Sequence, residues 1–278
     1  MPIARRFVLQ IARSLVQNVL SRLRAGECII NKEEIMFILV YGADGTGKSV
    51  QCKNILEASE SAEHWSFATK NRKLYETSGV ISEELLRFNN DSTINPYTTI
   101  DAFHDKIAAT VSGTPKTIVI DEITLLRKWA QPVVIEEINK QRRAYNKPPV
   151  TKIGESNYTA WARVNEIVYG KLELLANWSE MSGGIVLAIS SIVEERRMVQ
   201  DSDSGETKSV TTGNWIVDAK ENIRKLADVR VRLEKDGRNG RGYYAIFEKC
   251  QDWMTEGKES VKIDKDGLLT EFAVRGIL

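Results

Sequence analysis

The chain has 278 residues, of which 42% are hydrophobic and 28% charged, with 18 Gly and 6 Pro. This composition excludes collagen-like, low-complexity and wholly disordered chains, and the length allows one large domain or two small ones. No apolar run approaches the ~20 residues of a membrane-spanning helix, so we expect no integral membrane association. Three scattered cysteines are too few for a disulfide framework or a zinc cluster, which favours a reducing, cytoplasmic location.

The formal net charge is only +1, but the charge is unevenly distributed along the chain. Three segments carry an excess of basic residues: 1–26, with a balance of +5, 127–152, with +5, and 220–241, with +4. The near-zero total therefore does not exclude a nucleic-acid partner. Basic residues interleaved with Tyr145, Tyr158 and Trp161 would suit the phosphates and stacked bases of single-stranded DNA. A solvated helix face is the alternative interpretation.

The first 34 residues are predicted to form a basic amphipathic helix, because apolar residues recur there at helical spacing and no acid precedes Glu27. Three interpretations stay open for this helix. It packs on the domain or on a neighbouring subunit, it is an arm for nucleic acid or a membrane surface, or it is a transit peptide. Residues 35–278 show no internal repeat and no linker, so we predict one domain there.

Buried strands and amphipathic helices alternate along the rest of the chain. In order, we expect a strand at 35–41, a helix at 49–56, a strand at 64–69, helices at 82–88 and 99–111, a strand at 117–120, helices at 123–145 and 157–180, a strand at 185–189, a polar hairpin or mobile loop at 194–213, a helix at 219–227, and strands at 229–233 and 243–247. Pro132 interrupts one helical pattern. The alternation predicts an α/β fold with a mostly parallel central sheet flanked by helices.

A glycine-rich segment, Gly42 to Ser49, lies between the first predicted strand and the first helix of this domain. Its sequence, GADGTGKS, matches the P-loop pattern of Gly, four residues and Gly-Lys-Ser. Glycines let backbone N–H groups wrap a phosphate chain at a helix N-terminus, where the helix dipole also favours an anion. We predict that Lys48 reaches the β- and γ-phosphates of ATP and that the Ser49 hydroxyl binds Mg²⁺. The predicted nucleotide-binding residues are Gly42, Asp44, Gly45, Thr46, Gly47, Lys48, Ser49 and Val50.

Residues 118–122 read Ile-Val-Ile-Asp-Glu, a buried strand ending in two carboxylates. This is the layout of a Walker B element. Asp121 would hold Mg²⁺ through the ion's water shell, and Glu122 would orient or deprotonate the attacking water. Lys48 and Glu122 are therefore the two predicted catalytic residues. A solvated strand end is the alternative interpretation.

Three further residues are candidates for contact with the γ-phosphate. Ser190 and Ser191 follow the strand at 185–189, where they either sense that phosphate or cap the strand end. Lys249 ends a late strand and is either an exposed lysine or a cation delivered in trans to a neighbouring subunit. Arg196 and Arg197 are weaker candidates for the same role.

Other reactive residue types are scarce. His64 and His104 lie at no useful spacing from other metal ligands, so we interpret both as ordinary helix or strand residues. Cys52, one turn into the predicted P-loop helix, is interpreted as a small buried hydrophobe. With only two histidines and no evident triad, the sequence disfavours a Ser-His hydrolase.

Taken together, several segments resemble one family. They are GADGTGKS, TIVIDEIT, NYTAWARVNEIVYGKLELL, GGIVLAISS, KLADVRVRLEKDG and YYAIFEK. Their order and spacing over residues 36–253 resemble the RecA-like P-loop ATPases of phages, a nucleotide-binding group that includes ATP-dependent single-strand-annealing recombinases. The P-loop and Walker B segments match residue by residue.

This resemblance implies a RecA-like core that binds ATP and Mg²⁺, forms homo-oligomers and acts on single-stranded DNA during recombination in the host cytoplasm. By position, it implies that Lys48 and Ser49 contact the phosphates and Mg²⁺, that Asp121 is the Walker B acid and that Glu122 orients water. RecA itself places its catalytic glutamate after an earlier strand, where this sequence offers only Glu76. An ATP-driven motor or assembly factor with a protein partner, related to packaging or the virion, stays open as the alternative, and a small-molecule kinase is a third hypothesis.

Overall fold

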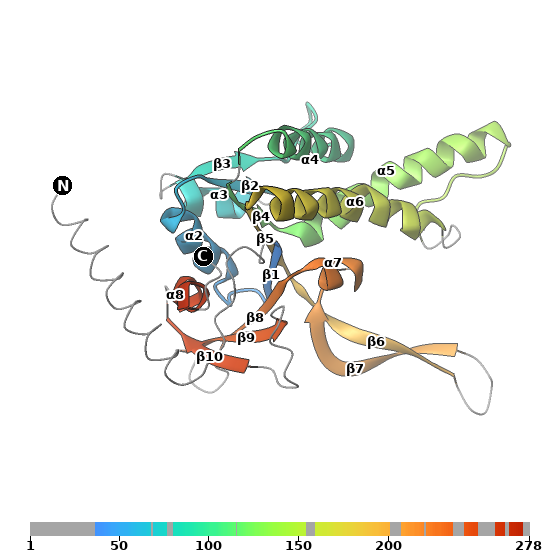
Figure 1. The fold of residues 1–278 in the computed structure, drawn as a ribbon. Helices are drawn as coiled ribbons and strands as arrows, with labels where there is room; N and C mark the ends of the chain where they lie inside the picture. Colours follow the sequence, from blue (N-terminus) through green and yellow to red (C-terminus); the bar gives the residue numbers. More distant parts are fainter. Residues whose placement is uncertain are drawn as a thin grey trace.

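The computed structural model describes residues 37–67, 69–76, 80–114, 116–153, 159–200, 207–219, 221–235, 242–249, 259–264 and 267–274 (Figure 1). Its strands are β1 (Phe37–Gly42), β2 (Ala62–Ser66), β3 (Ile81–Glu84), β4 (Thr117–Asp121), β5 (Ile185–Ser190), β6 (Ile192–Gln200), β7 (Thr207–Val217), β8 (Val229–Lys235), β9 (Tyr243–Lys249) and β10 (Glu259–Ile263). Its helices are α2 (Lys48–Ala58), α3 (Thr69–Glu76), α4 (Pro96–Val111), α5 (Ile123–Ala144), α6 (Thr159–Ser182), α7 (Glu221–Leu226) and α8 (Gly267–Val274).

Eight of these strands form one sheet in the order β10-β9-β8-β1-β5-β4-β2-β3. The six strands from β8 to β3 are parallel. At one edge, β9 pairs antiparallel with β8, and β10 pairs antiparallel with β9. Strands β6 and β7 form a separate two-stranded hairpin, which projects away from the sheet in Figure 1. The predicted α/β fold with a mostly parallel sheet flanked by helices is confirmed.

Both faces of the sheet are covered, because the central strands are apolar on both sides. On β1, Phe37, Leu39 and Tyr41 belong to the core under α4, α5, α6 and α7. Ile38 and Val40 face the second core, under α2, α3 and α8. In Figure 1 these helices form two layers on either side of the strands. The continuous apolar runs of the sequence are therefore buried strands, as predicted.

The direction of the crossover connections reverses at the centre of the sheet, which creates a crevice. The connection from β1 through α2 leads towards β2 on one face, whereas the connection from β4 through α5 and α6 returns to β5 on the other face. Right-handed crossovers that run in opposite directions must use opposite faces, and they open a crevice at the carboxyl ends of the strands. The residues after β1, β4 and β5 meet there.

Several element predictions are confirmed, one is wrong, and the strand predicted at 64–69 ends at Ser66, before α3 begins at Thr69. The described residues of the polar segment at 194–213 belong to the paired strands β6 and β7, and α5 continues through Pro132. The helix predicted at 82–88 does not form, because Ser82 to Glu84 pair with β2 as the edge strand β3. The short elements α3, β10 and α8 were not predicted. The predicted helix of residues 1–34 lies outside the described residues.

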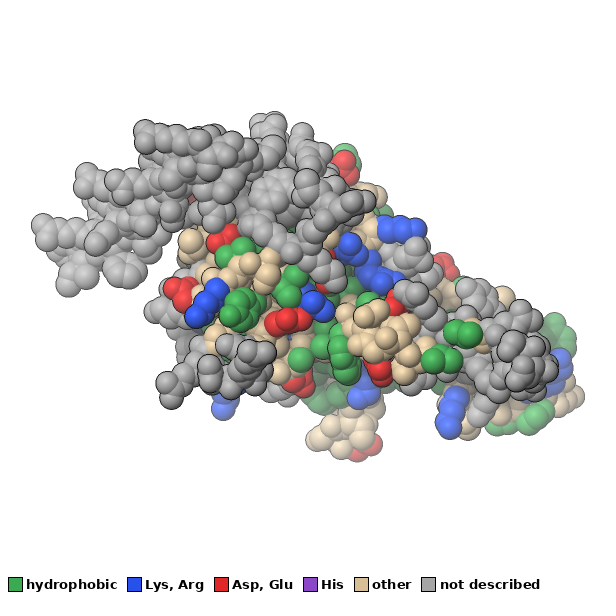
Figure 2. All heavy atoms as spheres, turned by 90° about the horizontal axis from the view of Figure 1, so that it is seen from below, with side chains coloured by type: hydrophobic (Ala, Val, Ile, Leu, Met, Phe, Trp, Pro, Cys, Tyr) green, Lys and Arg blue, Asp and Glu red, His purple; other side chains and the backbone are tan. Residues whose placement is uncertain are grey.

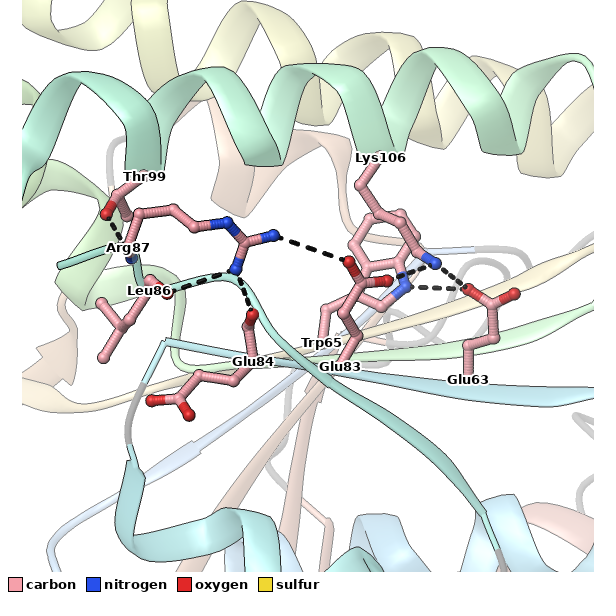
Figure 3. A network of polar contacts seen from close by, with 8 residues as sticks. All are labelled: Glu63, Trp65, Glu83, Glu84, Leu86, Arg87, Thr99 and Lys106. Atoms are coloured by element: carbon pink, nitrogen blue, oxygen red, sulfur yellow. Dashed lines mark hydrogen bonds and ion pairs between the residues drawn. The ribbon is translucent and has the colours of Figure 1, made fainter.

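Helix α4 is fastened to the sheet by a network of charged side chains at the amino end of β2 (Figure 3). Glu63 accepts a hydrogen bond from Trp65 Nε1 at 3.0 Å and lies 2.5 Å from Lys116 Nζ. Lys106 of α4 reaches both Glu63, at 3.1 Å, and Glu83 of β3, at 2.7 Å. Although burial alone would raise the pKa of Glu63, these cationic and indole donors lower it from 4.5 to about 2.

We expect Glu63→Gln to lower the free energy of unfolding by about 1 kcal/mol near neutral pH, after allowance for solvent screening. The pKa of Glu63 is lower in the folded protein, so its contribution is present above about pH 4.5 and is lost as the pH falls towards 2. The difference between the two proteins in urea unfolding should therefore shrink over that range. Glu57→Gln, which removes an exposed pair with Lys53, is the control and should cost less than about 0.5 kcal/mol.

Candidate functional site

The turn between β1 and α2 depends on three glycines. Gly45 and Gly47 have φ values of 76° and 84°, a left-handed conformation that other residues adopt only with strain. Gly42 is needed for a different reason, since a Cβ atom there would lie 2.4 Å from the carbonyl oxygen of Leu233 on β8. Thr46 closes the turn by donating its hydroxyl to the Ala43 oxygen at 2.8 Å. The glycine spacing of the sequence is thus explained by backbone geometry.

Lys48 begins α2 and folds back over this turn. Its Nζ donates to the carbonyl oxygens of Gly42, at 2.7 Å, and Ala43, at 3.1 Å, and the residue is only 8% exposed. A buried ammonium held inside a loop of backbone groups at a helix N-terminus favours an anion there. Of the other predicted binding residues, Asp44 is exposed on the turn and Val50 is 41% exposed on α2.

Asp121 and Ser49 come together although 72 positions separate them in the sequence. The Ser49 hydroxyl donates to Asp121 Oδ2 at 2.9 Å, and Asp121 is 1% exposed. Strand β5 lies between β1 and β4, so the ends of these two strands are about 10 Å apart, and the first turn of α2 spans the gap. A hydroxyl and a carboxylate side by side are oxygen ligands of the kind that Mg²⁺ takes.

His64 and Tyr75 complete the surroundings of Asp121. His64, on β2, is fully buried, its Nε2 lies 3.9 Å from Asp121 Oδ2, and its Nδ1 is 2.8 Å from Ser82 Oγ. Burial lowers the pKa of His64 to about 3, so the ring is neutral. Tyr75 stacks on this ring at 3.5 Å and donates its hydroxyl to the Ser49 carbonyl at 3.0 Å.

The interpretation of His64 as an ordinary strand residue therefore misses its contact with the Asp121 carboxylate. No local sequence signal could have found this group, because its members come from four separate segments. The interpretation of Cys52 is confirmed: it is completely buried in α2, and burial raises the pKa of its thiol.

Glu122 lies beside the two serines that follow β5. The Ser191 hydroxyl donates to Glu122 Oε1, and the Ser191 backbone N–H donates to Thr124 Oγ1 at 3.1 Å. Ser190 is completely buried, with its Oγ 3.1 Å from Thr124 Oγ1 and 3.2 Å from the Asp218 carbonyl. Ser191 is thus in contact with the predicted catalytic carboxylate, whereas Ser190 connects β5 to the start of α5.

A cavity of about 630 Å³ adjoins the turn on the side of β8. It is lined by residues 42–44 and Thr46 of the turn, by Ser191 and Ile192, by Trp215 of β7 and by residues 232–235 of β8. Cavities of this volume are typical of small-molecule sites. The Ser49–Asp121 pair lies on the other side, towards β4, so the turn separates the pair from this cavity.

Of the trans-acting candidates, the structure describes the backbone but not the side chains. Lys249 is the last residue of β9. This strand runs antiparallel to β8, and Lys249 pairs with Arg230 of β8. Because Leu233 is the β8 residue beside Gly42, the Lys249 backbone lies about three residues, or roughly 10 Å, below the turn. The side chains of Lys249, Arg196 and Arg197 lie outside the described residues.

No protein-family model and no curated protein matches the sequence. Among the described residues, the longest and most apolar helices fall short of what a membrane span requires. The assignment of function therefore depends on the geometry of this site.

Proposed function

We propose that this protein is a Mg²⁺-dependent ATPase with a RecA-like P-loop core, acting on single-stranded DNA in phage or mobile-element recombination. The observation that carries the proposal is the hydrogen bond between Ser49 and Asp121. It brings the two sequence motifs together at the carboxyl ends of the strands, where α/β proteins bind nucleotides. This is the relation that a P-loop serine and a Walker B aspartate need in order to share one ion.

The residues around the pair fit ATP and Mg²⁺. The turn offers backbone N–H groups at a helix N-terminus, Lys48 supplies a cation, and Ser49 and Asp121 supply oxygens for the ion. The 630 Å³ cavity beside the turn has room for the ribose and base. Bound Mg²⁺ would neutralise charge on the phosphates during transfer. Glu122, held by Ser191, would orient the attacking water.

Charged side chains on α5 and α6 bear on the DNA part of the proposal. Tyr145 is 76% exposed and lines a second cavity, of about 700 Å³, together with Arg142, Lys147 and Arg163. An exposed aromatic ring among basic side chains suits stacked bases and phosphates. Trp161 has a different contact, because it lies 4.7 Å under the Arg127 guanidinium. Tyr158 lies outside the described residues.

The test is phosphate release from ATP with single-stranded DNA, with double-stranded DNA and without nucleic acid. We expect Mg²⁺-dependent release that single-stranded DNA stimulates by about fivefold or more, a coupling of the usual size between two ligands. Phosphate release that ignores both nucleic acids would contradict the DNA part and favour a motor with a protein partner. Transfer of the phosphate to an added small-molecule acceptor would identify a kinase instead.

A further inference from the structure

A third cavity, of about 430 Å³, lies at the base of the hairpin and contains no residue of the turn. Three arginines line it: Arg224 of α7 and Arg230 and Arg232 of β8. Arg230 and Arg232 pair with Leu39 and Tyr41 of β1, two positions apart, so both side chains leave the same face of the sheet. Arg224 approaches that face from α7. We call this space the arginine cavity.

The positive charges of the arginine cavity exceed the negative ones. Its two carboxylates already accept hydrogen bonds: Glu248 from the Tyr41 hydroxyl, and Glu195 from Thr212 at 2.9 Å. Arg232 forms ion pairs with Glu234, at 3.0 Å, and Glu248, at 3.7 Å.

Arg224 and Arg230 differ from Arg232 in their contacts within the described residues. Arg224 and Arg230 form no ion pair with any residue in the described part of the chain, and the Nε atoms of all three arginines are buried without a hydrogen-bond partner there. Guanidinium groups with buried, unpartnered Nε donors favour an anion, and their planar forks match phosphate oxygens.

We propose that the arginine cavity binds the phosphate groups of a single-stranded nucleic-acid chain, an inference that rests on the proposed function. Trp215 lines the cavity and is 53% exposed, so it offers a stacking surface for a base next to the phosphate ligands. Figure 2 views the molecule from the side of β9, β10 and the hairpin, and the described basic and acidic side chains on this face are interspersed. We therefore assign the selectivity for phosphate to the cavity.

The position of the arginine cavity also connects strand binding to the nucleotide. Arg232 and Trp215 line both the arginine cavity and the cavity beside the turn. A ligand in one cavity changes the side chains available to a ligand in the other, and such coupling is reciprocal. A non-hydrolysable ATP analogue should therefore change the affinity for the strand, and the strand should change the affinity for the analogue by the same factor.

The test measures binding of a labelled oligo-dT of about 20 nucleotides to the full chain by fluorescence anisotropy, without nucleotide and over a range of salt. The double variant Arg224→Gln/Arg230→Gln should bind at least about tenfold more weakly. Its slope of log affinity against log salt should be about 1.4 shallower, because each phosphate contact on a single strand contributes about 0.7. The control is Lys53→Gln, which removes one positive charge from a lysine that pairs with Glu57 on α2, and it should leave the affinity unchanged.

Each outcome of this test is decisive. Unchanged affinity in the double variant overturns the proposal, and loss of binding in Lys147→Gln alone would place the strand at the cavity between α5 and α6. Inorganic phosphate is added as a competitor. If it displaces the oligonucleotide at an equal concentration, the cavity is a site for free anions, and the proposal is overturned. Arg230→Lys keeps the charge but loses the planar fork, so it should bind more weakly than the wild type and more tightly than the double variant. If the wild type binds no oligonucleotide, the DNA part of the proposed function fails as well. Binding of the ATP analogue reports on the ATPase part independently. It also shows that each variant is folded.

Discussion

Lys48→Ala is expected to reduce ATP hydrolysis at least about 100-fold. The Lys48 ammonium is held within the turn by two backbone carbonyls, next to the first N–H groups of α2. A cation at this place stabilises the negative charge that builds up on the transferring phosphate. Alanine removes the positive charge of the lysine and leaves its space empty. Steady-state phosphate release measures the effect.

Lys53→Ala is the matched control for this prediction. Lys53 lies five residues further along α2 and pairs with Glu57 at 2.6 Å, away from the turn. It should keep the wild-type rate. Because Lys48 also holds the turn together, the thermal unfolding of both variants should be compared. A folded Lys48→Ala protein with wild-type hydrolysis would refute the ATPase proposal.

Glu122→Gln is expected to slow hydrolysis by about 10²- to 10⁴-fold while leaving the binding of ATP nearly unchanged. Glutamine preserves the size of the side chain and still accepts the hydrogen bond from Ser191, but it cannot take a proton from water. The turn, Lys48 and the Ser49–Asp121 pair are untouched by this change. The affinity for a fluorescent ATP analogue and single-turnover hydrolysis separate the two effects.

Glu76→Gln tests the competing assignment of the catalytic glutamate. Glu76 is exposed at the end of α3, whereas Glu122 lies beside Ser191 at the carboxyl end of β4. We therefore expect Glu76→Gln to retain hydrolysis. If Glu76→Gln abolished hydrolysis and Glu122→Gln did not, the catalytic role of Glu122 would be wrong.

Strands and helices were predictable where one local pattern dominated. The central residues of β1, β4 and β5 form continuous apolar runs because these strands are buried on both faces, and such runs next to turn residues are typical of a parallel sheet. Residues 82–88 were misjudged because Leu85 and Leu86 are buried in either interpretation, and pairing of Ser82 with His64 on β2 decides for a strand. Local periodicity does not contain that pairing, since it involves residues 18 positions apart.

The α/β class, the glycine turn and the carboxylates at the end of β4 follow from local sequence alone, because each depends on backbone conformation or burial within a few residues. The contacts among side chains do not follow from it. Ser49 meets Asp121, and Tyr75 and His64 surround them, because β5 is inserted between β1 and β4 and α2 spans the gap. Arg224 of α7 lines one cavity with Arg230 and Arg232 of β8. Strand order and crossover direction determine these long-range contacts, and both depend on the packing of the whole chain.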